Sequence, residues 1–278
     1  MKVSHSFHIW LKGGIDLAGT EKSGQCFRWI EDGGSYLIPA GGMLARVSEA
    51  GDGIDVSILS SLPKKKTSPD IENFWKKYFD AELDYEAIRK MPEKKDRFLS
   101  CAASEGEGLR IIYQEAFETL ITFIISQRKS IPAIKTSVER ICSTVGRKIP
   151  GTDVYDFPAP KELAGLSGEE LSACGLGYRA PYIQAAAENV YHGDTDLEKM
   201  ACLSDDDLLE SLMALNGVGV KVANCTALFG FHRLDLFPID VWIQRALDAH
   251  YGGTFPLEKY HPYNGIMQQY IFAYRGQL

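Results

Sequence analysis

The spacing of hydrophobic positions changes near residue 70 of the chain. Before it, short apolar stretches such as Ser35–Pro39 and Gly53–Leu59 lie between clusters of Gly, Asp and Ser, a pattern typical of strands joined by tight turns. From Ile71 onward, apolar residues recur at three- and four-residue spacing, which predicts helices. The pattern therefore predicts an α+β chain in which a small N-terminal antiparallel β module packs on an all-helical body.

Clusters of Pro and Gly divide the helical region, so its helices can be placed one by one. We expect residues 1–105 to form the β-rich module with its trailing helices, and residues 106–278 to form the helical domain. The lysine-rich run Leu62–Asp70 indicates a solvated loop or an exposed edge. The helices expected after residue 113 are Glu115–Ser126, Ile134–Val145, Ser167–Ala173, Ala180–Val190, Ser204–Met213 and Val241–Tyr251.

Composition narrows the class of protein. Of the 278 residues, 45% are hydrophobic and 24% are charged, which excludes a disordered, collagen-like or coiled-coil chain. No apolar run approaches the roughly 18 residues of a membrane helix, so we expect no membrane partner. The net charge of −7 is unusual for a nucleic-acid binder, which usually has a basic surface. A DNA-binding function would need local backbone and side-chain sites instead.

The six cysteines are dispersed along the chain. They are too sparse for a disulfide scaffold, and the first residues, MKVSHSFHIW, do not form a signal peptide, so we expect a reducing cytosolic setting. Neither the cluster of four cysteines needed by an iron–sulfur centre nor a zinc-type spacing of Cys and His is present in the sequence. We therefore expect no metal site and no cofactor.

The segment from Leu215 to Cys225, LNGVGVKVANC, is the most informative in the chain. Gly217 and Gly219 follow one expected helix and precede another, and glycines at such a position allow a tight turn and a close backbone approach to a ligand. The free N–H groups at the start of the second helix can bind a phosphate without any net positive charge. The full pattern L-x-G-V-G-x-K-x-A predicts a helix-hairpin-helix DNA-binding turn.

Lys221 lies in the first turn of that second helix, between Val220 and Val222. The positive end of the helix dipole disfavours an ammonium group there, and apolar neighbours, if buried, act in the same direction. Both effects favour the neutral amine that a Schiff-base nucleophile requires. The alternative is a surface lysine that contacts phosphate or solvent.

Asp240 precedes the expected helix VWIQRALDAHY, where an aspartate is a typical N-cap. A second interpretation, compatible with the first, is an acid held rigidly beside Lys221. Cys225 shares a helix face with Lys221 because the two are four residues apart. Gln268 and Phe272 have the same spacing, and an amide with an aromatic ring suits the recognition of a base edge and base face. An ordinary amphipathic helix with Phe272 in the core is the alternative.

Together these residues resemble the 8-oxoguanine DNA glycosylases of the helix-hairpin-helix superfamily. The hairpin-lysine segment and Pro238–Val241 carry the superfamily signature. The resemblance extends from about Asp16 to Tyr274 and also covers Ser23–Trp29 (SGQCFRW), Glu118–Gln127 (ETLITFIISQ), Gly175–Ala180 (GLGYRA) and Gln268–Phe272 (QQYIF).

The resemblance implies a reaction on duplex DNA that contains 8-oxoguanine. The damaged base is flipped out of the helix into a pocket, and Lys221 attacks C1′ and displaces it. Asp240 helps to deprotonate the lysine and stabilises the charge that develops on the sugar. The resulting Schiff base then cleaves the strand by β-elimination, without a metal or an organic cofactor.

The resemblance also implies how the base is recognised. The carbonyl of Gly24 accepts a hydrogen bond from N7–H of 8-oxoguanine, a hydrogen that normal guanine lacks. Gln268 recognises the Watson–Crick edge, and Phe272 and Cys225 lie on either face of the purine. An unsatisfied buried group costs about 1–3 kcal/mol, so one such contact can discriminate the lesion.

Three residues are implied in contacts with the DNA around the lesion, besides Gly217 and Gly219 of the hairpin. Tyr178 inserts into the base stack, and Arg179 contacts the opposite cytosine. Arg128 stands where the family has an asparagine that fills the vacated space, and Ala133 stands where many members have a cytosine-contacting arginine. Trp242 replaces a histidine near the 5′ phosphate. We therefore expect weakened selectivity for cytosine, with Arg128 either filling the gap or contacting a phosphate.

Two other functions fit parts of the sequence. A glycosylase for alkylated purines would share the fold, but such enzymes rely on the aspartate without a lysine. A non-catalytic helix-hairpin-helix module would need neither Lys221 nor Asp240. We expect a monomer, located in the cytoplasm or nucleoid of a prokaryote or the nucleus of a eukaryote.

Overall fold

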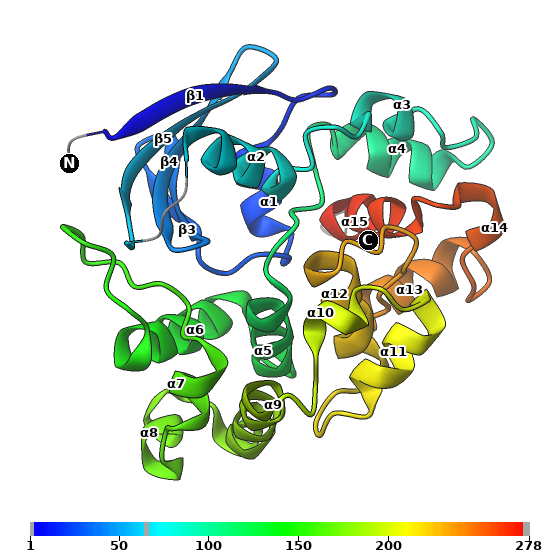
Figure 1. Cartoon of the computed structure of the whole chain (residues 1–278). Coiled ribbons are helices and arrows are strands. Elements are labelled where there is room, and N and C mark those ends of the chain that lie inside the picture. The colour runs from blue at the N-terminus through cyan, green and yellow to red at the C-terminus, as the bar shows by residue number, and fades with distance from the viewer. Residues whose placement is uncertain (1–2, 64–66, 275–278) are drawn as a thin grey trace.

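The structure is a computed structural model, and it describes residues 3–63 and 67–274 (Figure 1). The N-terminal module contains a five-stranded antiparallel sheet with the strand order β1-β5-β4-β3-β2. The expected α+β architecture, a small antiparallel β module on a helical body, is thus confirmed. The strands are β1 (His5–Trp10), β2 (Ile30–Asp32), β3 (Ser35–Ala40), β4 (Met43–Ala50) and β5 (Gly53–Ser61).

Two helices cover one face of this sheet, α1 (Leu17–Lys22) and α2 (Ser68–Tyr78) (Figure 1). Val47 and Val56 of the central strands share a buried core with Leu17 of α1 and Trp75 of α2. Burying side chains of this size contributes about 1.5–3 kcal/mol each, which holds the module together. The hydrophobic pattern of the first 60 residues predicted strands and did not predict helix α1.

Helix α2 begins earlier than its hydrophobic spacing predicts, at Ser68 rather than Ile71. Thr67 and Asp70 form a capping box, and a proline lies in the first turn, which together start a helix before its first apolar residue. The end of the run expected to be a loop is therefore helical, and Lys64–Lys66 within that run lie outside the described residues.

The helical body forms the lower half of the molecule in Figure 1 and extends up its right side. The six helices expected after residue 113 are present, and the largest difference is the start of α6 at Ile131 instead of Ile134. The helices are α3 (Tyr85–Arg89), α4 (Arg97–Glu105), α5 (Ala116–Ser126), α6 (Ile131–Val145), α7 (Pro160–Ala164), α8 (Gly168–Ala173), α9 (Ala180–His192), α10 (Leu197–Met200), α11 (Asp205–Met213), α12 (Val220–Gly230), α13 (Val241–His250), α14 (Leu257–Tyr260) and α15 (Asn264–Tyr274), with a 3-10 turn η1 (Gly177–Arg179).

One large hydrophobic core joins these helices. Phe123 of α5, Ala227 of α12 and Tyr270 of α15 are all buried in it. Leu99 and Ala102 of α4 are buried in this core too, so the helices that trail the β module pack with the body. The division at residues 105 and 106 stays a prediction. Within the described ranges, every helix is too short or too polar to cross a bilayer.

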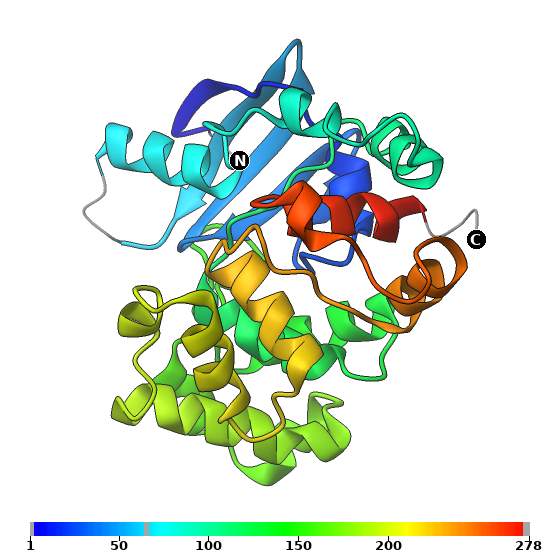
Figure 2. The same cartoon turned by 90° about the vertical axis from the view of Figure 1, so that its right-hand side faces the viewer.

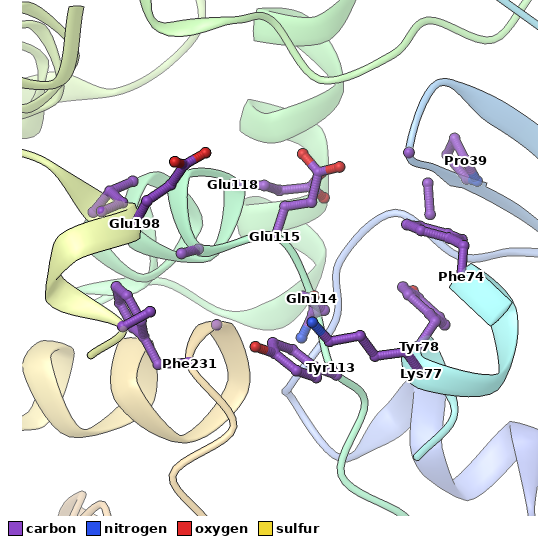
Figure 3. Close-up of a pocket in the computed structure, with 16 residues that line it drawn as sticks. Pro39, Phe74, Lys77, Tyr78, Tyr113, Gln114, Glu115, Glu118, Glu198 and Phe231 are labelled. Atoms are coloured by element: carbon purple, nitrogen blue, oxygen red, sulfur yellow. The ribbon is translucent and has the colours of Figure 1, made fainter. Parts of the chain in front are cut away.

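The β module is attached to the body by a partly buried ion pair between Arg28 and Glu118 of α5. Nη1 of Arg28 lies 3.2 Å from Oε2 of Glu118, and the same guanidinium donates to the carbonyl of Tyr155. Glu118 also lines a cavity of about 440 Å³ between the two parts, which Figure 3 shows. Lys77 and Tyr113 line the same cavity, and Nζ of Lys77 lies 4.3 Å from the ring centre of Tyr113.

Burial of Glu118 gives a first prediction, on the pH dependence of stability. Burial raises the pKa of this carboxyl to about 7, although the charge of Arg28 opposes the shift. The folded chain then binds more protons than the unfolded chain between about pH 4.5 and pH 7. The free energy of unfolding should therefore fall by about 1–3 kcal/mol as pH rises through this window.

Thermal denaturation of the parent and of Glu118→Gln between pH 5 and pH 7.5 measures this effect. The variant should have a flatter profile than the parent because its amide does not titrate. Parallel profiles would contradict the assignment. A uniform loss of stability in the variant is a separate effect, because it leaves the buried charge of Arg28 without its partner.

Candidate active site

The helix-hairpin-helix turn lies between α11 and α12, as the sequence predicts. Gly217 has a φ of +79°, and a Cβ at this position would lie 2.3 Å from Cγ of Tyr182, so only glycine fits. Nε2 of Gln127 donates a hydrogen bond to the carbonyl of Gly217 (3.0 Å) and fixes the turn on the end of α5. Gly219 is the N-cap of α12, so the first-turn N–H groups of this helix are available at the turn.

Lys221 is the second residue of α12. Its Nζ lies 5.0 Å from the ring centre of Phe123, at the wall of a cavity. Only one of the two apolar neighbours of this lysine is buried: Val222 is buried, whereas Val220 is 67% exposed. Burial raises the pKa of the Cys225 thiol, whereas the charge of Lys221 and a hydrogen bond from it act in the opposite direction. The lysine and the cysteine therefore share a helix face, as their spacing predicts.

Asp240 caps α13. Its Oδ1 accepts hydrogen bonds from the N–H groups of Trp242 (2.9 Å) and Ile243 (2.8 Å), which confirms the predicted N-cap. Asp240 and Lys221 line the same cavity, although they belong to different helices. Asp240 can therefore be both the N-cap of α13 and an acid beside Lys221, because its Oδ1 accepts the capping hydrogen bonds while the residue also lines the cavity.

The cavity has a volume of about 960 Å³ and is bounded by four parts of the chain: the segment around Gly24, the loop after α5, the ends of α12 and α13, and α15. A smaller recess of about 50 Å³ shares walls with it. All six residues predicted for catalysis and base recognition line this recess: Gly24, Lys221, Cys225, Asp240, Gln268 and Phe272. Residues separated by almost 250 positions therefore meet at one site.

Gly24 is held against the ring of Phe272. Its φ is +75°, and a Cβ would lie 3.3 Å from Cε1 of that ring. Gln25 fixes this segment, because its Nε2 donates to the carbonyl of Arg110 (2.8 Å) and its Oε1 accepts from the N–H of Ile112 (2.7 Å). The SGQ motif thereby attaches this left-handed glycine to the segment that joins the two parts of the molecule.

Gln268 is buried in α15 and is already part of a hydrogen-bonded chain. Its Nε2 donates to the carbonyl of Pro238 (3.0 Å), and its Oε1 accepts from Nε2 of Gln269 (2.9 Å). The sequence indicated the first of these two glutamines as functional and missed the second. A pair of adjacent buried amides was the signal that could have found it.

The predicted DNA-contacting residues differ in exposure. Tyr178 is 53% exposed and Arg128 is exposed at the rim of the cavity. Arg128 has a φ of +51°, a backbone conformation that asparagine adopts more readily than arginine. Arg179 is instead 6% exposed: its guanidinium donates to the carbonyls of Leu176 and Gln127 and lies 4.3 Å from the ring centre of Tyr178.

A further residue of the loop after α5, Lys129, fixes the turn that carries Tyr178. Nζ of Lys129 donates to the carbonyl of Gly175 (2.6 Å) and to Oγ of Ser137 (2.6 Å). Burial lowers the pKa of this lysine, and the nearby charge of Arg179 has the same effect. The sequence offered no signal for this contact, because two adjacent basic residues in a loop more often face solvent.

Exposed apolar side chains surround the hairpin and the start of α13. They are Val220, Ile239, Val241 and Trp242, and Arg245 lies 4.9 Å from the ring centre of Trp242. In the described ranges, no three His, Cys, Asp or Glu side chains are grouped to hold a metal ion.

Comparison with known proteins covers both parts of the chain. Residues 11–120 match the family described as the N-terminal domain of 8-oxoguanine DNA glycosylase, and residues 121–259 match the HhH-GPD superfamily of base excision DNA repair proteins. A probable N-glycosylase/DNA lyase of Methanothermobacter thermautotrophicus is 31% identical and covers 87% of this chain and 85% of its own.

Solved structures show the same similarity. The 8-oxoguanine glycosylase/lyase of Clostridium acetobutylicum, in complex with duplex DNA containing cytosine opposite 8-oxoguanine, has a TM-score of 0.85 and 29% identity. It covers 100% of this chain and 99% of its own. The structure of MBOgg1 with a low-affinity DNA ligand has a TM-score of 0.89 and 33% identity, and covers 100% and 97%.

Proposed function

This chain belongs to the 8-oxoguanine DNA glycosylases of the HhH-GPD superfamily, and on that premise we propose that Lys221 and Asp240 are its catalytic residues. The protein is an N-glycosylase/DNA lyase that excises 8-oxoguanine from DNA. One observation supports the residue assignment above all others: Lys221 and Asp240 line the same recess as the four residues proposed to hold the base.

In the proposed mechanism, the lesion is extruded from the duplex and enters the cavity. The amine of Lys221 forms a bond to C1′ as the bond from C1′ to N9 breaks and the base leaves. Asp240 stabilises the positive charge that develops on the sugar and helps to remove a proton from the amine. Opening of the sugar ring gives a Schiff base, and loss of a C2′ proton then expels the 3′ phosphate.

Base recognition follows from the walls of the recess. The carbonyl of Gly24 accepts a hydrogen bond from the N7–H group that distinguishes 8-oxoguanine from guanine. Phe272 and Cys225 contact the two faces of the purine, and Gln268 contacts its Watson–Crick edge. The closeness of Gly24 to the ring of Phe272 supports this arrangement, because both residues line the recess and a Cβ on Gly24 would lie 3.3 Å from that ring.

The DNA itself is proposed to contact the hairpin and the exposed residues around it. Gly217 and Gly219 present backbone N–H groups to a phosphate, Tyr178 inserts into the base stack, and Arg128 enters or borders the vacated space. The N–H groups in the first turn of α12 then supply the attraction for phosphate that the acidic net charge of the chain does not. We propose a monomer, located in the nucleoid or cytoplasm of a prokaryote or the nucleus of a eukaryote.

A second prediction concerns the base opposite the lesion. Excision should vary by no more than about tenfold among cytosine, adenine, guanine and thymine, because a well-formed side-chain pair to a base supplies about 1–3 kcal/mol of discrimination and this chain has few candidates. Arg128 and Ala133 replace the family's residues, and the guanidinium of Arg179 is bonded to two carbonyls. Single-turnover rates on four duplexes measure this. A preference for cytosine of about a hundredfold or more would contradict it.

The function is tested by strand nicking and borohydride trapping on a duplex with one 8-oxoguanine. A lyase of this type cuts the strand and gives a covalent adduct after reduction. Excision of alkylated purines with 8-oxoguanine left intact would show that the base-binding assignments are wrong. Binding without excision or trapping would identify a non-catalytic hairpin module.

A further inference from the structure

The recess contains a polar group that the proposed mechanism does not use, the side-chain amide of Gln269. This residue is 5% exposed and lies in α15 next to Gln268. It lines the recess together with Lys221 and Asp240. Its Oε1 is buried and accepts no hydrogen bond from any described residue.

The orientation of this amide is determined by its neighbours. The carbonyl of Pro238 can only accept a hydrogen bond, so Gln268 must direct its Nε2 towards it. Oε1 of Gln268 is then the acceptor facing Gln269, which must direct its own Nε2 towards Gln268. Oε1 of Gln269 is consequently directed away from this chain of hydrogen bonds.

A buried amide oxygen without a partner is rare in folded proteins, because water no longer solvates it. At the wall of a binding recess, a ligand with an N–H group can supply the missing hydrogen bond to this oxygen. The two amides together then offer one remaining N–H on Gln268 and acceptor oxygens on both residues.

We propose that Gln269 is a second base-recognition residue, whose Oε1 accepts a hydrogen bond from the exocyclic 2-amino group of the extruded base. This inference rests on the proposed function. The Watson–Crick edge of a guanine-type base presents, in order, the O6 acceptor, the N1–H donor and the 2-amino donor. Gln268 donates its free N–H to O6 and accepts a hydrogen bond from N1–H with its Oε1. The 2-amino group then donates to Oε1 of the neighbouring Gln269.

The test compares 8-oxoguanine with 8-oxohypoxanthine, which lacks only the 2-amino group, in the parent and in Gln269→Met. Methionine has a similar volume and no strong hydrogen-bonding atom. The parent should excise 8-oxoguanine about tenfold faster than 8-oxohypoxanthine, the effect of one unsatisfied hydrogen bond. Gln269→Met should lose this preference, with a loss of about tenfold confined to 8-oxoguanine.

Gln184→Met is the matched control, because Gln184 is a half-buried glutamine of α9 outside the cavity, and it should keep the preference of the parent. An equal loss on both bases in Gln269→Met would mean that Gln269 acts only through Gln268, and the inference would be wrong. Equal rates on both bases in the parent would overturn it without any variant. A parent that does not excise 8-oxoguanine would instead reject the proposed function.

Discussion

Replacing Lys221 by glutamine is expected to abolish borohydride trapping and to lower strand cutting at 8-oxoguanine by about a thousandfold or more. The amide cannot form an imine with C1′, so both the covalent intermediate and the β-elimination that follows it are lost. The fold should persist, because glutamine and lysine have similar helix propensities and the side chain at position 221 lines the cavity instead of packing in the core. Gel analysis of nicked and reduced products measures both losses.

The control for this variant is Lys199→Gln, which removes a surface lysine of α10 from outside the cavity. It should cut and trap like the parent. Binding of lesion DNA by Lys221→Gln, followed by fluorescence anisotropy, should remain within about tenfold of the parent because the hairpin is intact. A trapped adduct in Lys221→Gln would show that another amine is the nucleophile.

Local signals in the sequence were sufficient for the hairpin and for the cap of α13. Gly217 and Asp240 have positions that depend on their own backbone and on the first turn of the next helix, and such short-range physics is visible in the sequence. The gathering of Gly24, Lys221 and Gln268 was predicted by family resemblance rather than by pattern, because no periodicity connects segments so far apart.

What the sequence could not reveal is which partner a polar side chain chooses in the folded molecule. Arg179 contacts the carbonyl of Gln127, and Gln127 contacts the carbonyl of Gly217, across 52 and 90 positions of the chain. Arg179 was predicted to contact DNA and Gln127 had no predicted role, because neither carbonyl is near these side chains in the sequence. The start of α2 differs, because Thr67 and Asp70 have the spacing of a capping box in the sequence, and the interpretation of Leu62–Asp70 as a loop did not use that signal.

The second large effect is expected from Asp240→Asn, because this change separates the two roles of the residue. Asparagine is as good an N-cap as aspartate, and its Oδ1 can accept the same two hydrogen bonds from Trp242 and Ile243. Thermal stability should therefore stay close to that of the parent. Excision of 8-oxoguanine should nevertheless fall by about 10²- to 10³-fold, because the neutral amide no longer stabilises the charge that develops on the sugar.

Asp240→Ala provides the comparison, because it removes the cap and the charge together. It should lose about 1 kcal/mol of stability in addition to the loss of activity seen in Asp240→Asn. Single-turnover excision and thermal denaturation of the three proteins distinguish the possibilities. If Asp240→Asn excises at the rate of the parent and only Asp240→Ala is impaired, then Asp240 is a cap whose carboxylate takes no part in the chemistry. If both variants lose excision while only the alanine variant loses stability, then one carboxylate both begins α13 and acts at the reacting sugar.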